Sequence, residues 1–289
     1  MQTVPYRFQL LAPPGTVHSG PSAPSSAEND LYERYLASLQ KLRGKCYLAD
    51  RAIGPEQLDH TGRFRMHRDH NCWHFLLVDP EDEVVGCVRY LTHLPTASPA
   101  DLLTSHSAIG QDPVWRDKFR GALASDLTFA RKNGLTFIEV GGWAIETAFR
   151  QTRAALEILL ASFAWGRMIG GAIGCCTATF RNSSASMLRR IGGRSLEYNN
   201  EVIPPYSDAA YGCMMEALRF HFQDFDPRYQ KMVDSIHTRM SEQSTITCSL
   251  PDAALEQQDV ITNTRSLLAL DCALQRAGQS VGASASVSV

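Results

Sequence analysis

Residues 137–193 decide the fold, and they divide into four segments. These are FIEVGGWAI at 137–145, RQTRAALEILLASFAWGRMI at 150–169, AIGCCTATF at 172–180 and RNSSASMLRRIGG at 181–193. The first and third segments carry apolar residues as strands do, whereas the second repeats them at helical spacing. The fourth combines capping residues with a glycine stop and predicts a short helix. Because 172–180 is nearly continuous in apolar and small residues, we expect a strand buried on both faces, as in a parallel sheet.

Gly141 and Gly142 interrupt the first strand. A glycine pair inside a strand usually marks a bulge, or a place where another backbone or a ligand comes close. We therefore expect the strand to bend here and to offer its backbone to a ligand. The residues that supply this backbone are Gly142, Trp143, Ala144 and Ile145.

A basic turn leads from this strand into the long helix. Arg150, Gln151, Thr152 and Arg153 form the turn, and Ala154 and Ala155 follow in the first helical turn. The free N–H groups and the dipole of a helix start favour an anion, and two arginines add to this. The alternative is an ordinary helix start with solvated arginines. Together with the bent strand and its neighbour, the turn describes a slot for a long phosphate-bearing thioester.

The composition is that of a globular chain. Its 289 residues are 44% hydrophobic, which is enough for a sizeable core, and the net charge of −2 argues against a general nucleic-acid binder. The eight cysteines form no regular framework, so we expect reduced thiols. No signal-like start and no apolar run of membrane-span length is present, so the sequence predicts a cytoplasmic protein without a membrane span.

The pattern divides the chain into three parts. Residues 1–29 are rich in proline, serine and glycine and predict a disordered N-terminal tail. An amphipathic helix capped by Asn29 or Asp30 opens the main domain, at 30–225. Residues 226–289 predict a polar, partly helical C-terminal appendage, with one helix near 254–277.

Further elements of the main domain follow from turn chemistry and periodicity. Two apolar runs joined by DPED at 79–82 predict an antiparallel hairpin. Apolar residues at helical spacing predict a helix at 114–133, ended by Gly134. The segments SLEYNNEVI at 195–203 and YGCMMEALRFHF at 211–222 predict the last two strands.

This order of parts resembles the GNAT acyltransferase superfamily. The usual turn signature of that family spans six residues: Arg or Gln first, Gly fourth, and Gly or Ala sixth. In this chain Arg150 matches the first position and Ala155 the sixth, whereas Arg153 replaces the glycine. The resemblance implies an α/β fold in which helices flank a mixed central sheet. It also implies that the phosphate of coenzyme A or of a carrier protein rests on the turn, and that the short helix, with Asn182 at its start, lies beside the donor.

Two further segments resemble the acyl-homoserine-lactone synthases and N-acyl amino acid synthases within this superfamily. VVGCVRYL places Arg89 after a glycine and a small residue, and FIEVGGWAI places Glu139 three residues before Gly142, which replaces the family's arginine, with Trp143 as the aromatic. The resemblance covers roughly 30–225. It implies an acyl-CoA or acyl-carrier-protein donor and an amino acid or a derivative as the acceptor.

Amide formation from a thioester needs a neutral amine, a site for the oxyanion and a proton for the leaving thiolate. The backbone of 142–145 is the candidate oxyanion site. Glu139 is the candidate proton acceptor, and the alternative is a structural carboxylate paired with Arg89 or another base. The tyrosine that many GNAT enzymes use on the short helix corresponds to Leu188, so Tyr198 or water would take its place.

A rival motif is HRDHNCWH at 67–74, in which His67, His70, Cys72 and His74 are all possible zinc ligands. Their spacing fits no standard structural zinc module, and we expect no metal. If the segment is a strand, three of these residues share one face, which is more typical of a pocket wall or a partner surface.

The sequence thus predicts an N-acyltransferase that moves an acyl group from an acyl-CoA or acyl-carrier-protein thioester to the amine of an amino acid or related small molecule. It predicts no permanently bound cofactor and no nucleic-acid partner. The alternative is a degenerate GNAT fold that binds an acyl thioester or a protein without catalysis. Arg153 and Leu188 favour that alternative.

Overall fold

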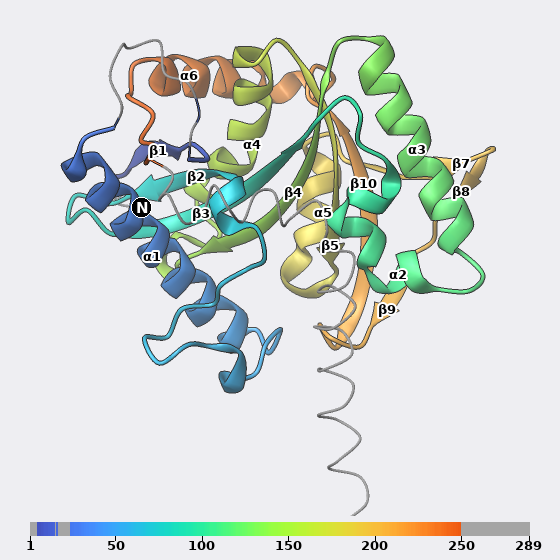
Figure 1. Ribbon diagram of the computed structural model, residues 1–289, viewed down its shortest axis with the longest axis horizontal. Helices are drawn as coiled ribbons and strands as arrows, with labels where there is room; N and C mark the ends of the chain where they lie inside the picture. Colours follow the sequence, from blue (N-terminus) through green and yellow to red (C-terminus); the bar gives the residue numbers. More distant parts are fainter. Residues whose placement is uncertain (1–4, 15, 17–23, 250–289) are drawn as a thin grey trace, which may run out of the picture. The chain divides into compact units, whose positions relative to one another are not determined.

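The structure is a computed structural model that describes residues 5–14, 16 and 24–249. Its centre is a mixed eight-stranded sheet in the order β1-β2-β3-β4-β5-β10-β6, with β9 paired to β10 (Figure 1). The strands are β1 (Arg7–Leu11), β2 (Trp73–Val78), β3 (Val84–His93), β4 (Thr136–Ile145), β5 (Ala172–Thr179), β6 (Arg194–Ser195), β9 (Tyr206–Asp208) and β10 (Cys213–His221). Among the named strands of the described residues, β4 and β5 form the only parallel pair.

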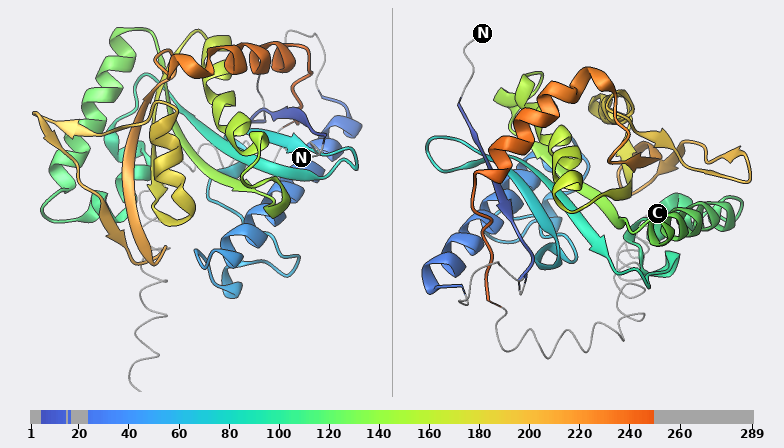
Figure 2. Two further views of the ribbon diagram at one scale, coloured as in Figure 1. Left: turned by 180° about the vertical axis from the view of Figure 1, so that it is seen from behind. Right: turned by 90° about the horizontal axis from the view of Figure 1, so that it is seen from above.

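Helices cover both faces of the sheet (Figures 1 and 2). They are α1 (Ser26–Ala49), α2 (Ala108–Gln111), α3 (Arg116–Lys132), α4 (Arg153–Met168), α5 (Ser184–Arg190) and α6 (Gln230–Ser241). Helices α1 and α3 bury their apolar stripes on one face, and α4, α5 and α6 share a single core on the other. This arrangement confirms the predicted α/β class and the flanked mixed sheet.

The bulge predicted in β4 is present. Arg89 pairs with Gly141 and Cys87 with Ala144, so β4 carries one more residue than β3 over this interval. Gly142 has φ of +62°, a left-handed conformation that side chains disfavour and that a bulge of this kind requires. The extra residue packs the partly buried Trp143 against the core on the α4 side and places Ala144 in the core on the α1 side.

The parallel pairing of β4 and β5 covers only the first part of both strands. Its last pair is Glu139 with Cys175, although β4 runs on to Ile145 and β5 to Thr179. Beyond Glu139 the two strands therefore make no ladder with each other in the part of the chain described. The backbone of 142–145 lies in this diverging part.

The predicted hairpin and the main helices are confirmed. Strands β2 and β3 are antiparallel and flank the DPED turn, and α3 and α4 begin and end within a few residues of their predicted limits. Helix α1 begins earlier than predicted, at Ser26, because Ser25 and Glu28 form a capping box there.

The prediction of a wholly disordered N-terminal tail is wrong for β1. Arg7–Leu11 pairs along β2 from Val78 to His74, and Phe8 and Leu11 are buried. A segment of five residues is not stable alone. Here the edge of β2 pairs with its backbone groups, and its two apolar side chains are buried in the cores on either side of the sheet.

The prediction of an appendage that begins at 226 is also wrong. Helix α6 packs against α4, and Val233, Ile236 and Met240 belong to the same core as α4. Residues 244–248 then lie along β1, where Leu11 and Ile246 form a parallel bridge. The helix predicted near 254–277 lies outside the described residues.

The predicted strand at 195–203 is broken into short pieces. β6 pairs with β10, whereas β7 (Glu197–Tyr198) and β8 (Glu201–Val202) form a separate two-residue hairpin. Asn199 and Asn200 both have positive φ, as a tight hairpin turn requires. The chain therefore reverses at these two residues and does not continue as a single strand. No helix in 5–14, 16 and 24–249 is long and apolar enough to cross a membrane.

Candidate functional site

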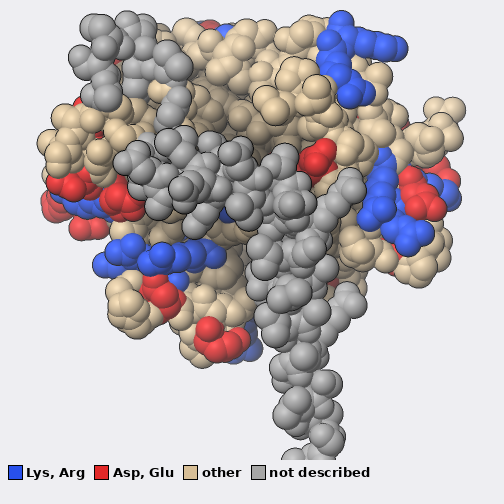
Figure 3. Space-filling model, viewed as in Figure 1, with Lys and Arg blue, Asp and Glu red and all other residues tan. Residues whose placement is uncertain are grey.

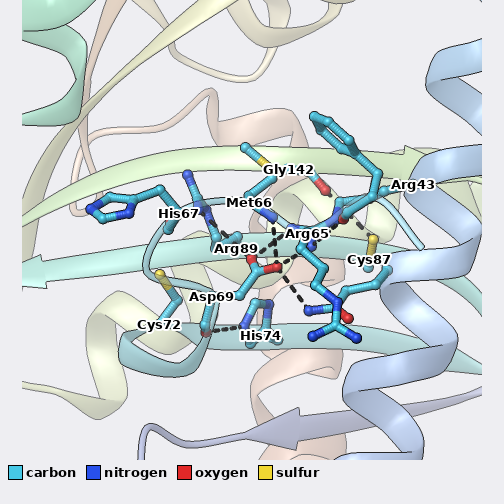
Figure 4. A network of polar contacts seen from close by, with 12 residues as sticks. Arg43, Arg65, Met66, His67, Asp69, Cys72, His74, Cys87, Arg89 and Gly142 are labelled. Carbon is cyan, nitrogen blue, oxygen red and sulfur yellow. Dashed lines mark hydrogen bonds and ion pairs between the residues drawn. The ribbon is translucent and has the colours of Figure 1, made fainter. Parts of the chain in front are cut away.

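A buried ion cluster lies on the α1 side of the sheet, next to the β4 bulge (Figure 4). Arg43 of α1 donates through Nη1 and Nη2 to the two carboxylate oxygens of Asp69, with a distance of 2.9 Å from Nη1 to Oδ1. The side chain of Arg43 is 0% exposed and that of Asp69 is 3% exposed. Burial acts to raise the pKa of Asp69, but the hydrogen bonds and charge of Arg43 outweigh it and lower that pKa. Asp69 is therefore a buried carboxylate anion.

Arg89 of β3 is the second guanidinium in this cluster. Its Nη1 donates to the carbonyl of His67 at 2.8 Å and lies 3.8 Å from Oδ1 of Asp69. The carboxylate of Asp69 is already engaged by Arg43, Gln40 and the amide of Met66, so it meets only part of the hydrogen-bonding capacity of Arg89. Nε of Arg89 is buried and has no partner among the described residues. Since buried donors are normally satisfied, Arg89 retains capacity for another acceptor.

The two glycines of the bulge differ in what faces them. A Cβ on Gly142 would lie 3.2 Å from both Nη1 of Arg43 and Cβ of Arg89, so the arginines occupy the space that a side chain would need. A Cβ on Gly141 would meet a single described atom within 4 Å outside its chain neighbours, Nη2 of Arg89 at 3.7 Å. Among the described atoms, a side chain at Gly141 would thus meet only the guanidinium group of Arg89 within 4 Å.

Glu139 lies on the same face of the sheet but is not paired with Arg89. Its carboxylate accepts from Nε2 of His93 at 2.8 Å, from the amide of Leu103 at 2.9 Å and from the amide of Thr104 at 2.6 Å. Burial acts to raise the pKa of Glu139, yet His93 and the two amides outweigh it and lower that pKa. Glu139 thus ties β3 and the 3-10 helix Leu103–His106 to β4. Of the alternative of a structural carboxylate paired with Arg89 or another base, the structure shows the second form, with His93 as the base.

The histidine and cysteine motif does not gather into a metal site. His74 is buried on β2 with Nε2 at 2.7 Å from the carbonyl of Asp69, whereas His70 lies exposed on the 3-10 helix Asp69–Asn71. Burial lowers the pKa of His74 to about 4. Within the described part of the chain, no three His, Cys, Asp or Glu side chains are placed to hold a metal ion.

The basic turn forms the start of α4 as predicted. Gln151 has φ of +58°, and the hydroxyl of Thr152 accepts from the amide of Ala154 at 3.2 Å, which caps the helix. Arg153 points outward, with 63% of its side chain exposed, and pairs with Glu157. Arg150 is engaged by Asp50, with 3.3 Å between Nη1 and Oδ1. Ala154 and Ala155 pack into the core below.

Asn182 lies in the predicted place, directly before α5, whereas Tyr198 lies away from that helix. Asn182 is exposed in a short turn after β5 and caps no helix with its side chain. Tyr198 packs over Gly121 of α3, whereas α5 contributes Leu188 to the core on the opposite face of the sheet. Tyr198 therefore does not occupy the place of the missing tyrosine beside the short helix.

Sequence reasoning missed Arg43, Asp69 and His93. Arg43 was detectable, because it follows Leu39 by four residues on the buried stripe of α1 and so could not lie on the solvated face. Asp69 and His93 gave no local signal, since their partners come from other segments of the chain.

Comparison with known proteins supports the fold. No protein-family profile matches the chain, and no curated protein matches it in sequence. The CoA-dependent acyl-homoserine lactone synthase BjaI, solved with SAM and isopentyl-CoA, matches with a TM-score of 0.51 at 13% identity, over 89% of this chain and 100% of that one. The chain has a GNAT fold. The predicted resemblance is thereby confirmed at the level of the fold.

Two further solved structures match this GNAT fold less closely. TofI, solved with an inhibitor and MTA, has a TM-score of 0.46 at 16% identity, over 79% of this chain and 96% of that one. FeeM, an N-acyl amino acid synthase from uncultured soil microbes, has a TM-score of 0.39 at 11% identity, over 76% and 93%.

The charges on the face of this GNAT fold shown in Figure 3 are mixed. Acidic and basic side chains lie near one another, without a continuous basic surface among the residues coloured there. Two guanidinium groups, those of Arg43 and Arg89, lie buried beside the bulge with the single carboxylate of Asp69 between them. The arrangement is suited to bind a small anionic group next to the diverging strands.

Proposed function

We propose that the chain is an N-acyltransferase that moves an acyl group from a CoA or carrier-protein thioester to the amine of a small acceptor that also carries a carboxylate. The GNAT fold supports the reaction class. The observation that carries the acceptor chemistry is Arg89, a buried guanidinium whose Nε has no partner among the described residues and whose Nη2 lies 3.7 Å from the place of a Cβ on Gly141.

The donor lies, in this proposal, where β4 and β5 diverge. The ladder between the strands ends at Glu139 and Cys175, and the backbone of 142–145 continues beyond it. Nε1 of Trp143 is buried there and has no partner among the described residues, so a carbonyl of a bound pantetheine arm would satisfy it. The phosphate end of the donor lies at the turn formed by Arg150, Gln151, Thr152 and Arg153.

The acceptor enters from the α1 side, over Gly141. Its carboxylate pairs with Arg89, which gains a charge-assisted hydrogen bond of about 1.5–3 kcal/mol. Nε of Arg43 is also buried without a partner among the described residues, but both Nη atoms of Arg43 are occupied by Asp69 and the carbonyl of Phe64, which leaves Arg89 as the better candidate. Arg89 thus orients the amine toward the thioester, and orientation is a large part of the rate gain in such reactions.

The chemical step is the attack of the neutral amine on the thioester carbonyl. The new C–N bond forms, the C–S bond breaks, the amine loses a proton and the thiolate gains one. Amide groups of 142–145 are the candidate donors to the oxyanion. With three donors on its carboxylate and a lowered pKa, Glu139 is a weak proton acceptor, so its geometry supports a positioning role.

The test is turnover by the full chain with a panel of acyl-CoAs and acyl-carrier proteins, and with amino acids as acceptors, followed by mass spectrometry of new amides. For the best acceptor, Arg89→Gln is expected to raise KM by about 10- to 100-fold, while KM for the decarboxylated amine stays near the wild-type value. Arg190→Gln, at an exposed arginine of α5, is the matched control. If Arg89→Gln raised KM equally for the acceptor and for its decarboxylated amine, the proposal that Arg89 binds the acceptor's carboxylate would be wrong.

The second candidate function is a binding module that holds an acyl thioester without catalysis. The saturated carboxylate of Glu139 favours it, together with Leu188 in the core where many GNAT enzymes place a tyrosine. The two functions separate when acyl-CoA binding and thiol release are measured together. Binding with no thiol release for any acceptor would favour the module.

A further inference from the structure

Asp208, the last residue of β9, is a buried carboxylate without a cationic partner. It is 8% exposed. Its Oδ1 accepts from the amides of Ala210 at 2.9 Å and Tyr211 at 3.2 Å, which holds the turn that leads into β10. Among the described residues, Oδ2 accepts no hydrogen bond and no Lys, Arg or His forms an ion pair with Asp208. Since buried carboxylates are normally paired, Asp208 retains capacity for a cation.

Arg181 contacts the same turn but is engaged by carbonyl groups. Its Nη2 donates to the carbonyl of Gly212 at 3.2 Å, and its Nη1 donates to the carbonyl of Asp50 at the end of α1. Arg181 therefore fixes the turn at 208–212 to α1 without pairing with the carboxylate of Asp208. The turn is held in place, and the charge of Asp208 stays available.

Tyr206 is a second polar group on the same side of β9. Tyr206 and Asp208 are buried and Ser207 between them is exposed, so both side chains face the interior, where Tyr206 belongs to the core under α3. Tyr206 is 8% exposed, and its Oη has no hydrogen-bond partner among the described residues. Burial is the main cause that raises the pKa of Tyr206, and the charge of Asp208 also raises it. The hydroxyl is therefore a neutral, unpartnered group close to the carboxylate.

Asp208 and Arg89 are linked through Tyr211, in the turn after β9. Burial is the main cause that raises the pKa of Tyr211, whereas the charge of Asp208 raises it further and the charge of Arg89 lowers it. The hydroxyl of Tyr211 thus lies within electrostatic range of both charges. In Figure 1, α1 lies to the left of the diverging strands and β9 to their right. The acceptor position over Gly141 therefore has a guanidinium group on β3 and a carboxylate on β9 in its surroundings.

We propose that Asp208 and Tyr206 bind a cationic side chain of the acceptor, which makes the acceptor a basic amino acid. The inference rests on the proposed function, since it assumes that the acceptor's carboxylate pairs with Arg89. The amine that attacks the thioester must be neutral, and a buried carboxylate favours the charged form of an amine beside it. Asp208 is therefore suited to a second cation that does not react. An acceptor with a carboxylate and a cationic side chain complements both buried charges at once.

The test is turnover of the full chain with one fixed acyl donor and two pairs of acceptors, lysine with norleucine and arginine with citrulline. Within each pair the first side chain is cationic and the second is neutral. The wild type is expected to show a KM about tenfold or more lower for lysine and arginine. Asp208→Asn keeps Oδ1 for the two amides of the turn and is expected to remove this preference, with KM for norleucine and citrulline near the wild-type value. Asp117→Asn, at an exposed aspartate of α3, is the matched control and should keep the preference. Tyr206→Phe should raise KM for the cationic acceptors alone.

The outcomes separate this inference from the proposed function. Wild-type protein that acylates norleucine as well as lysine would overturn the inference, while the proposed acyl transfer stands. If Asp208→Asn raised KM equally within each pair, Asp208 would only hold the turn, and the inference would again be overturned. Acyl transfer to no amino acid at all would contradict the proposed function and the inference together. Circular dichroism of each variant checks that the fold is intact.

Discussion

Nε2 of His93 lies 2.8 Å from Oε2 of Glu139 and joins β3 to β4 inside the molecule. Both side chains are 5% exposed, and the same carboxylate holds two amides of the 3-10 helix Leu103–His106. Glu139 therefore fixes the segment that follows β3 to the start of the diverging strands. Its position explains how a buried carboxylate near the site can be essential for the architecture without moving a proton.

The first prediction is that Glu139→Gln lowers stability more than it lowers turnover of the remaining folded protein. The loss is expected to be about 2–4 kcal/mol at pH 7, because a charged acceptor of three buried donors is removed. The pKa of folded Glu139 lies below that of the unfolded chain, so its contribution is complete above about pH 4.3 and is lost as pH falls through the folded pKa. Urea unfolding of the wild type and of Glu139→Gln, from pH 7 to below pH 4, gives the free energy of unfolding of each. The difference between the two should shrink only at the acid end. A Glu139→Gln protein of wild-type stability with turnover reduced about 100-fold would restore Glu139 as the base.

The second prediction concerns the bulge. Gly142→Ala is expected to destabilise the protein by about 1–3 kcal/mol, because alanine must adopt φ of +62° and its Cβ lies close to both arginines. Gly141→Ala is the control: its Cβ meets one atom, so stability should change by less than about 1 kcal/mol. Thermal unfolding checks both. Gly142→Val should also abolish acyl transfer, and full turnover in that variant would place the donor elsewhere.

The third prediction compares two ion pairs between α4 and α6. Glu157 is 2% exposed and accepts from Tyr6, Arg153 and Arg239, whereas Asp234 pairs with Arg167 at the surface. Glu157→Gln is expected to cost about 2–4 kcal/mol of stability, and Asp234→Asn clearly less, because water screens the exposed pair of Asp234 with Arg167. Denaturant midpoints of the two variants give the comparison. Equal losses would mean that the buried pair contributes no more than the exposed one.

The fourth prediction is an acid sensitivity that depends on His74. Burial lowers the pKa of His74 to about 4, against about 6.5 in an unfolded chain. Between these values the unfolded state binds the extra proton, so stability should fall as pH drops from about 6.5 to 4, by up to about 1.4 kcal/mol per pH unit. His74→Gln keeps a donor for the carbonyl of Asp69 and should flatten this dependence. His70→Gln, at an exposed histidine, should keep the wild-type dependence of stability on pH. If that dependence were flattened in His70→Gln, its cause would not be the buried His74.

The sequence predicted what local chemistry determines. The glycine pair marked the bulge in β4, the DPED turn marked the hairpin, and helical spacing marked α3 and α4, because each signal lies within the element it specifies. The segments β1 and α6 were missed for the opposite reason. Each is too short to be stable by itself, and its order depends on partners far away in the chain, β2 for one and α4 for the other.

The site was predictable to a smaller degree. Arg89, Glu139 and the turn at Arg150 were found from the pattern, but their partners were not. His93 comes beside Glu139 only through the register of β3 on β4, which pairs His93 with Phe137. Asp69 reaches Arg43 through a loop whose course no periodicity describes. Asp50 bridges Arg150 and Arg181 from the end of α1, across about 100 residues of chain or more.

Residues 244–248 and β1 complete one edge of the sheet together, and this has a consequence for the order of folding. Gln9 donates to the carbonyl of Ser244, and the amide of Ile246 donates to the carbonyl of Leu10, across more than 230 positions of sequence. During synthesis, the outer edge of β1 stays without its partner until the segment around Ile246 has left the ribosome. Of the described strands, β1 is made first and is among the last to be closed, so the nascent chain carries an open, partly apolar sheet edge until residues 244–248 emerge.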